Sequence, residues 1–334
     1  MKKKMICTAI TALFTLFGSA YAQQTINGAG ASFPAPVYQN WTYTFSQGSH
    51  GIKVNYQSVG SGAGFNQIKA KTIDFAGTDN PLTLEEQERE GMLQFPMLTG
   101  GVVLIVNIPG IGDNELKLSR QALANIYLGK ITSWDDPAIT GINPGLKLPK
   151  MKINVVRRAD SSGTSFIFTN YLSKISSEWA EKVGAGASVQ WPVGIGGQKN
   201  PGVCNNVVKM VGSIGYTEYT YAVEGKIACA QLENRAGVYV KPTVETFSAS
   251  AANADWKNAP GYYMVLTDQE GADSWPITGV TYILIRKDCP AETKAAIKTY
   301  VNWCFTTGAT AAQRLNYVPI PENVVKLIQS TVLN

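Results

Sequence analysis

Residues 52–86, IKVNYQSVGSGAGFNQIKAKTIDFAGTDNPLTLEE, show the alternation of strands and helices from which the fold class is predicted. The alternating run 52–56 predicts a half-buried strand, and the glycine-rich turn 60–64 follows it. A second apolar run, 73–76, ends in another turn, and the capping box Thr83-Leu-Glu-Glu86 then opens a helix. Short strands that alternate with helices through glycine-rich turns predict an α/β fold.

The same alternation continues on both sides of this stretch. Val37, Trp41 and Phe45 keep helical spacing after Pro34, and an amphipathic pattern covers residues 294–305. A late strand is predicted over residues 281–285. Two continuous apolar runs rich in β-branched residues predict buried parallel strands over residues 101–106 and 153–156.

The first 22 residues have the three parts of a secretion signal. Three lysines precede the apolar run 5–17, and small residues stand at Ala20 and Ala22, so cleavage is expected after Ala22. The apolar run is too short to span a bilayer, and no later stretch is long enough either. We therefore expect a soluble, exported protein in the periplasm. An N-terminal membrane anchor is the alternative.

The charge of the mature chain argues against a polyanion partner. The signal removes three of the 29 basic residues and none of the 24 acidic ones, which leaves a net charge of only +2. Nucleic acid is therefore not expected as a partner.

Four cysteines remain after the signal, and an even number in an exported chain suggests two disulfides. Of the three possible pairings we expect Cys204–Cys229 and Cys289–Cys304. A zinc site is the alternative, but no CxxC spacing occurs and His50 is the only histidine.

Four turns rich in Gly, Ser or Thr stand at the start of expected helices. Helix N-termini present unpaired N–H groups and a partial positive charge, so they favour anions. One such turn is only a helix cap, whereas four of them near an arginine pair suggest convergence on a small oxyanion. The turns are Gly28–Pro34, Gly60–Gly64, Gly77–Asn80 and Arg158–Thr164.

Other chemistries fit the sequence less well. The turn 60–64 follows a strand but lacks the GxGxxG spacing of a dinucleotide site, and no Walker A motif occurs. Ser162 does not lie in a GxSxG motif, and a catalytic triad would need His50, whose glycine-rich neighbours indicate an exposed turn. The clusters of metal ligands that metal-dependent phosphatases need are absent. No cofactor or metal and no enzymatic activity are therefore expected.

These turns also carry a family resemblance. The segments INGAGASFPAPVYQNW, VNYQSVGSGAG, IDFAGTDNPL, VVRRADSSGTSF and NPGLKLP closely resemble the periplasmic phosphate-binding proteins of phosphate-specific ABC transporters, along nearly all of the mature chain. The resemblance implies a two-lobed periplasmic-binding-protein fold, type II-like. In that fold each lobe is a mixed sheet flanked by helices, and two crossover strands join the lobes, which close on phosphate.

The resemblance also implies a ligand set. Ser32 stands where the family commonly has Thr and keeps the hydroxyl donor, while Gly62-Ala63 replace a more usual Ser-Gly. Asp160 is expected to pair with Arg158. The implied phosphate site, which includes Asp160 as the partner of Arg158, comprises Ser32, Phe33, Ser61, Asp79, Arg158, Asp160, Ser162, Gly163 and Thr164.

The family's connectivity implies a discontinuous first lobe. With crossings near Thr99-Gly100 and Trp275-Pro276, lobe 1 comprises residues 23–99 plus 277–334, and lobe 2 comprises residues 100–276. Ser32, Ser61 and Asp79 would then face the fourth turn across the cleft. The implied partners are inorganic phosphate and the permease subunits of an ABC importer, and the implied state is a monomer.

The acidic member of this set predicts selectivity. Phosphate at neutral pH carries a proton that Asp79 can accept, whereas sulfate would meet the carboxylate with lone pairs only. An oxyanion binder for sulfate or molybdate is therefore the second hypothesis, and an extracellular phosphatase is the third.

Overall fold

The computed structural model describes residues 23–333. The predicted signal segment and its cleavage site lie outside these residues. Ten strands form one mixed sheet, in the order β2-β1-β3-β12-β4-β8-β6-β7 with β9 and β13 also paired to β4. The strands are β1 (Gln24–Gly30), β2 (Ile52–Ser58), β3 (Phe75–Thr78), β4 (Met92–Asn107), β6 (Asn154–Arg158), β7 (Ile195–Gly197), β8 (Ser213–Glu218), β9 (Ala228–Cys229), β12 (Thr278–Arg286) and β13 (Val318–Pro319).

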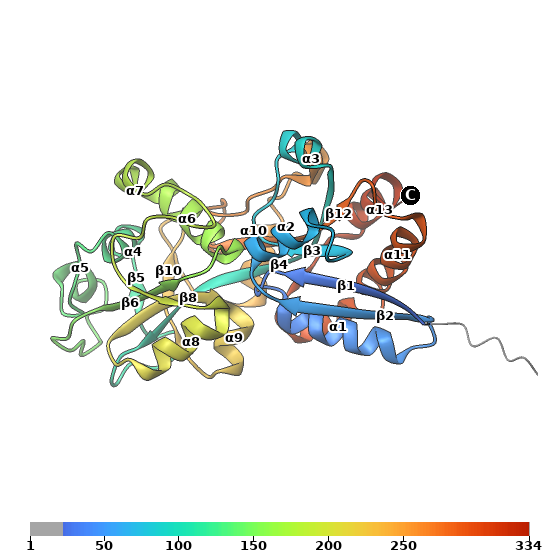
Figure 1. Cartoon of the computed structure of the whole chain (residues 1–334). Coiled ribbons are helices and arrows are strands. Elements are labelled where there is room, and N and C mark those ends of the chain that lie inside the picture. Colours follow the sequence, from blue (N-terminus) through green and yellow to red (C-terminus); the bar gives the residue numbers. More distant parts are fainter. Residues whose placement is uncertain (1–22, 334) are drawn as a thin grey trace, which may run out of the picture.

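A second sheet has three short strands, and helices surround both sheets (Figure 1). The short strands are β5 (Lys117–Leu118), β10 (Gln231–Glu233) and β11 (Tyr239–Val240). The helices are α1 (Ala35–Gln47), α2 (Ser61–Lys69), α3 (Leu84–Glu90), α4 (Arg120–Tyr127), α5 (Pro137–Thr140), α6 (Gly163–Ile175), α7 (Ser177–Lys182), α8 (Lys199–Lys209), α9 (Tyr219–Glu224), α10 (Val244–Ala251), α11 (Ala291–Phe305), α12 (Ala309–Arg314) and α13 (Glu322–Thr331), with short 3-10 helices η1 (Trp256–Asn258) and η2 (Pro260–Tyr262).

Strand β4 connects the two ends of the large sheet (Figure 1). Its residues Met92–Gly101 pair antiparallel with β12, and Val102–Asn107 pair antiparallel with β8. We call β1, β2, β3, β12 and Met92–Gly101 the β1 lobe, and β6, β7, β8 and Val102–Asn107 the β6 lobe. The predicted α/β fold with two lobes and mixed sheets is confirmed.

One strand direction was predicted wrongly. Residues 101–106 were expected to form a parallel strand, but this part of β4 is antiparallel to both of its neighbours, β8 and β9. Its apolar run reflects burial on both faces, which the crossing between lobes imposes whatever the strand direction. The other run, in β6, is parallel to β7 and β8 as predicted.

Several local predictions are confirmed. Helix α1 begins directly after Pro34, α11 covers the predicted residues 294–305, and β12 includes the predicted late strand. The capping box forms, because Thr83 Oγ1 accepts the Glu86 N–H while the Glu86 carboxylate accepts the Thr83 N–H. These features depend on neighbouring residues alone, which is why the sequence predicts them well.

The two predicted disulfides are wrong, because the four cysteines of residues 23–333 are free thiols. Cys204 lies against the Thr217 hydroxyl at 3.5 Å, and burial raises the pKa of its thiol to about 11. Cys229 and Cys304 are also buried in the core. Buried cysteine behaves as a small apolar side chain, a use that an even count of cysteines does not exclude.

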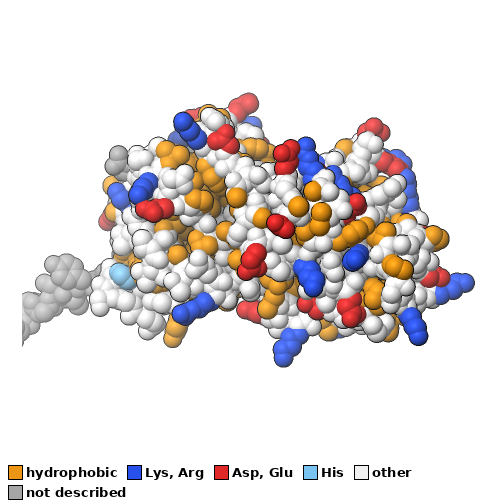
Figure 2. Space-filling view, turned by 180° about the vertical axis from the view of Figure 1, so that it is seen from behind, with side chains coloured by type: hydrophobic (Ala, Val, Ile, Leu, Met, Phe, Trp, Pro, Cys, Tyr) orange, Lys and Arg blue, Asp and Glu red, His pale blue; other side chains and the backbone are white. Residues whose placement is uncertain are grey.

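The surface is mixed in charge. Figure 2 shows acidic and basic side chains interspersed over one face, without a broad patch of a single sign. His50 is exposed, as its glycine-rich neighbours predict, and its ring stacks on Phe45 with 4.3 Å between centroids. Within residues 23–333, no helix combines the length and apolar character that a membrane crossing requires.

Candidate anion-binding site

The four predicted turns meet where the β1 lobe and the β6 lobe touch. We call the residues Ser32, Phe33, Ser61, Asp79, Arg158, Asp160, Ser162, Gly163 and Thr164 the interlobe cluster. The Gly163 N–H donates to Ser61 Oγ at 3.1 Å, and Asn200 at the start of α8 donates to Ser32 Oγ at 3.1 Å. Both contacts cross between the lobes, so turns that are far apart in sequence form one site.

The serine hydroxyls of the cluster already accept hydrogen bonds from N–H groups. The three oxygens and their donors are Ser32 Oγ with Asn200 N and Nδ2 (3.3 and 3.1 Å), Ser61 Oγ with Gly163 N (3.1 Å), and Ser162 Oγ with Ser165 N (3.1 Å). A hydroxyl whose lone pairs are occupied in this way still has its own proton to donate. The site can therefore present several neutral O–H donors to an anion.

Asp79 is the exceptional residue of the cluster. It follows β3, its side chain is 1% exposed, and neither carboxylate oxygen has a hydrogen-bond partner among the described residues. Burial raises the pKa of Asp79 to about 7, while the nearby Thr281 hydroxyl, the Arg158 charge and the Ser61 hydroxyl act in the opposite direction. A buried acceptor without a donor is costly, so this carboxylate fits a site that a proton-bearing ligand completes.

Arg158 supplies the positive charge of the cluster, at the end of β6. Its Nε and one terminal nitrogen donate to the two oxygens of Asp160, at 2.8 and 2.5 Å. Burial alone would raise the pKa of Asp160, but the bonds and charge of Arg158 outweigh it and hold that pKa below its usual range. The remaining nitrogen, Nη1, is buried without a partner, so the predicted pair forms and one donor stays available.

Glycine allows the lobes to approach at two points of this site. A Cβ atom at Gly163 would lie 2.6 Å from Asp79 Oδ2, and one at Gly60 would lie 2.7 Å from Asp160 Oδ2. Gly60 also has φ of +97°, a conformation that side chains rarely adopt. A larger residue at either position would push a carboxylate out of the cluster.

Sequence reasoning missed three residues that complete the site. Besides its bonds to Ser32, the Asn200 amide lies 3.5 Å from Thr164 Oγ1. Lys199 donates its backbone N–H to Asp160 and its Nζ to the Ser58 carbonyl across the lobes. Tyr221 Oη donates to the Ser32 carbonyl at 2.6 Å.

Gly196 and Gly197 directly precede Gln198–Asn200, where α8 begins, so this segment is also a glycine-containing turn at a helix start. It was the available signal for this fifth turn.

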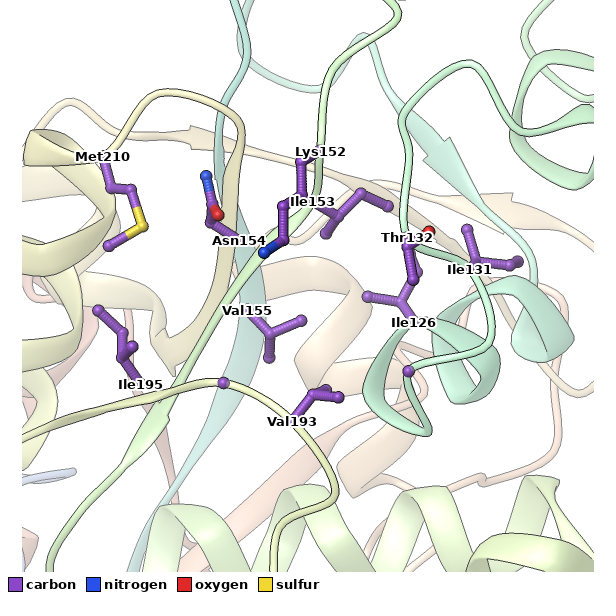
Figure 3. Close-up of a pocket in the computed structure, with 12 residues that line it drawn as sticks. Ile126, Ile131, Thr132, Lys152, Ile153, Asn154, Val155, Val193, Ile195 and Met210 are labelled. Carbon is purple, nitrogen blue, oxygen red and sulfur yellow. The ribbon is translucent and has the colours of Figure 1, made fainter.

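A different pocket is visible in Figure 3, within the β6 lobe. Its volume is about 370 Å³, and it shares no residue with the interlobe cluster. Ile126, Val155, Val193 and other aliphatic side chains line it, and Lys152 is its only charged residue. This pocket lacks the convergent donors that an anion needs. Residues 23–333 contain no group of three or more His, Cys, Asp or Glu that could hold a metal ion.

Comparisons with known proteins agree with this description. Residues 17–307 match the model of the PBP superfamily domain, which defines the class of two-lobed binding proteins. The chain is 49% identical to the phosphate-binding protein PstS of Pasteurella multocida, over 99% of this chain and 95% of that protein. It is 46% identical to the Haemophilus influenzae protein of the same name, over 95% and 96%. The chain therefore belongs to the PstS family of phosphate-binding proteins.

Solved structures support the same fold at lower identity. A high-affinity periplasmic phosphate-binding protein with bound phosphate has a TM-score of 0.73 and 19% identity, covering 93% of this chain and 94% of that one. A putative phosphate ABC transporter substrate-binding protein from Clostridium perfringens has a TM-score of 0.66 and 16% identity, covering 89% and 100%. The family is one of binding proteins and not of enzymes, as the sequence predicts.

Proposed function

We propose that this protein binds inorganic phosphate outside the cytoplasm and delivers it to an ABC importer. One observation carries the proposal: the buried Asp79 carboxylate, which has no donor of its own, lies in a cluster of unused O–H donors beside Arg158. Both named PstS relatives and the two neighbouring structures are described as phosphate-binding or phosphate-transport proteins, which supports the choice of ligand.

The proposed ligand groups are those of the interlobe cluster. The backbone of Phe33 and the hydroxyls of Ser32, Ser61, Ser162 and Thr164 donate to the phosphate oxygens. The backbone N–H of Gly163, which donates to Ser61 Oγ in this structure, turns to the anion when it binds. Arg158 offers its free nitrogen, while Asp160 holds the guanidinium in place. Because Asp160 balances the charge of Arg158, neutral dipoles supply most of the attraction.

Asp79 supplies the selectivity in this proposal. Phosphate donates its proton to the carboxylate in a short charge-assisted hydrogen bond. Sulfate has no such proton at neutral pH, so its lone pairs would oppose a buried acceptor. A binder of sulfate or molybdate, the second hypothesis, is disfavoured by Asp79 for this reason.

We also propose how the lobes are divided and how they act. Residues 23–99 plus 277–334 form one lobe and residues 100–276 form the other, and phosphate selects the population in which they are closed. The change of partner along β4, from β12 to β8 between Gly101 and Val102, supports a boundary in this region. The protein acts as a periplasmic monomer that docks on inner-membrane permease subunits after its signal is cleaved behind Ala22.

Titration calorimetry tests this function with three ligands, namely phosphate, sulfate and a phosphomonoester. We expect tight binding of phosphate, no measurable binding of sulfate, and neither tight binding nor turnover of the ester. Equal affinity for sulfate would favour the second hypothesis, and release of phosphate from the ester would favour the phosphatase.

A further inference from the structure

Glu218 is a second buried carboxylate outside the interlobe cluster. It is the last residue of β8, it pairs with Val102 where β4 passes between the lobes, and its side chain has no exposed surface. No lysine or arginine in residues 23–333 forms an ion pair with it. A buried acid in such a place needs hydrogen bonds or a proton.

Two hydroxyl groups contact the Glu218 carboxyl group. Thr220 Oγ1 lies 3.1 Å from Oε1, and Tyr317 Oη lies 2.9 Å from Oε2. Each hydroxyl also contacts a backbone carbonyl, with 2.6 Å from Thr220 Oγ1 to Leu315 O and 2.7 Å from Tyr317 Oη to Phe33 O. The Thr220 backbone N–H donates to Oε1 at 3.0 Å.

The number of protons decides the state of this network. Four oxygen–oxygen contacts need protons, the two hydroxyls supply one each, and the carbonyls of Leu315 and Phe33 can only accept. If Glu218 is ionised, two of the four contacts bring lone pairs together in a buried space. If Oε2 carries a proton, it donates to Tyr317 Oη, and Tyr317 is free to donate to Phe33 O.

The network ends at the proposed phosphate site. Phe33, which accepts from Tyr317, stands beside Ser32 in the first turn. The Glu218 N–H lies 3.4 Å from Asn200 Oδ1, and the Asn200 amide donates to Ser32 Oγ. Glu218 of the β6 lobe therefore holds the Ser32–Phe33 turn of the β1 lobe through two intermediate side chains.

We propose that Glu218 is a neutral carboxylic acid when the lobes are in contact, and that it is a positioning residue for the Ser32–Phe33 turn. This inference rests on the proposed function, because the turn is assigned there as a phosphate ligand. Glu218 itself does not touch the ligand. Deprotonation of Glu218 weakens phosphate binding by breaking the contact between Tyr317 and the turn.

The surroundings of Glu218 favour the neutral form. The titratable groups that face it are Cys204 on α8, Tyr219, Tyr221 and Glu224 on α9, and Tyr317 before β13. None of them is a cation. Burial and, to a smaller extent, the charge of Glu224 raise the pKa of Glu218 to about 8, while the hydrogen bonds from Thr220 and Tyr317 act in the opposite direction.

The sign of the pH dependence follows from this shift. A carboxyl group whose pKa is raised when the lobes meet takes up a proton on closure. Its contribution to phosphate affinity is therefore complete at low pH and is lost as the pH rises to about 8. Above about pH 8 the contribution of Glu218 to phosphate affinity does not change further.

Phosphate titrations at pH 6, 7, 8 and 9 test the inference with two substitutions. At pH 6 the network is complete in the wild type. Glu218→Ala removes it and should therefore weaken phosphate binding about tenfold at this pH. Glu218→Gln should restore most of that affinity, because its amide N–H replaces the acid proton toward Tyr317. The affinity of Glu218→Gln relative to the wild type should then rise toward pH 8, by at most about tenfold per pH unit, and level off above it.

The ratio of the two proteins cancels the titration of phosphate and of Asp79. Glu181→Gln removes the same charge from an exposed position and should follow the wild type at every pH. A ratio of Glu218→Gln to wild type that does not change with pH would overturn the inference. If the wild type itself fails to bind phosphate, the proposed function fails instead.

Infrared difference spectra give a readout that is independent of phosphate and of affinity. At pH 7 the wild type should show the carbonyl band of protonated carboxylic acids, with a larger part from Glu218, which Glu218→Gln removes, and a smaller part from Asp79, which Asp79→Asn removes. Loss of the whole band in Asp79→Asn, with no change in Glu218→Gln, would show that Glu218 is ionised and the inference is wrong. Thermal unfolding of each variant separates these outcomes from misfolding.

Discussion

Asp79 and Glu218 are both buried carboxylates at the meeting point of the lobes, yet their surroundings differ. The Glu218 oxygens contact two hydroxyls and one N–H, whereas the Asp79 oxygens have no hydrogen-bond partner among the described residues. Burial raises the pKa of both, to about 7 for Asp79 and about 8 for Glu218.

The two environments give the two buried acids different roles. Where the protein supplies the partners, the acid joins segments of the fold, and its role is structural or positioning. Where the protein leaves the acid without a partner beside unused donors, the missing partner is a ligand. The contrast between Asp79 and Glu218 can therefore be tested by changing what each of them faces.

Removing Arg158 should have the largest effect. Arg158→Ala deletes the charge beside Asp79 and leaves Asp160 half-buried without its partner. Losing a buried charged donor to a bound partner costs about 2–5 kcal/mol of binding free energy, so phosphate affinity should fall by roughly thirty-fold to several thousand-fold in calorimetry. Arg235→Ala, at an exposed position, should bind as the wild type does. An Arg158→Ala protein that binds within tenfold of wild type would remove Arg158 from the site.

The pH dependence of stability without phosphate should show the next effect. Because the pKa of Asp79 is raised in the folded protein, its contribution to the free energy of unfolding is complete below about pH 4. It is lost as the pH rises to about 7, by about 4 kcal/mol at most. Calorimetric unfolding of wild type and Asp79→Asn between pH 4 and 8 measures this difference.

The asparagine variant should become more stable than the wild type with rising pH over this range. Subtracting the two curves removes the contributions of carboxyl groups such as Asp160, whose pKa is lowered and which act in the opposite direction. Parallel curves would show that Asp79 titrates normally in the folded protein.

Selectivity should change less than affinity or stability. Asp79→Asn replaces a pure acceptor by a group that can donate to sulfate, so the discrimination between phosphate and sulfate should decrease by about 2 kcal/mol, or about 30-fold. Glu218→Gln is the matched control, since it also turns a buried acid into an amide but should retain the discrimination. If Asp79→Asn ignores sulfate as the wild type does, Asp79 is not the selectivity residue.

The parts of this molecule that the sequence predicts are the local ones. The strand of residues 52–58, the capping box at Thr83 and the helix after Pro34 depend on periodicity and on side chains a few residues apart. Three of the four turns of the site were found for the same reason, because α1, α2 and α6 begin in them or directly after them. The remaining turn, Gly77–Asn80, ends before the cap of α3 at Thr83 and is not a helix start. The family resemblance then implied which residues of the turns belong together.

The parts that were missed depend on contacts between distant segments. Asn200 meets Ser32 across 168 positions, and Tyr317 meets Glu218 across 99, so neither pair leaves a local pattern. The antiparallel direction of β4 is set by its partners β12 and β8 and not by its own apolar run. The free cysteines were misjudged because burial, which makes Cys204 a core side chain, cannot be inferred from spacing.

Ionic strength should have the smallest effect on phosphate affinity. It tests whether buried neutral donors around Asp79, and not exposed charges, attract the anion. The charge of Arg158 is balanced by Asp160 within the site, and both side chains are screened from solvent by the touching lobes. Salt therefore has little exposed charge to screen, and phosphate affinity should change by less than about threefold between 50 and 500 mM salt. Asp160→Asn leaves Arg158 unbalanced and should make the dependence steeper. A steep dependence in the wild type would mean that exposed cations, and not a buried set of neutral donors around one acid, hold the anion.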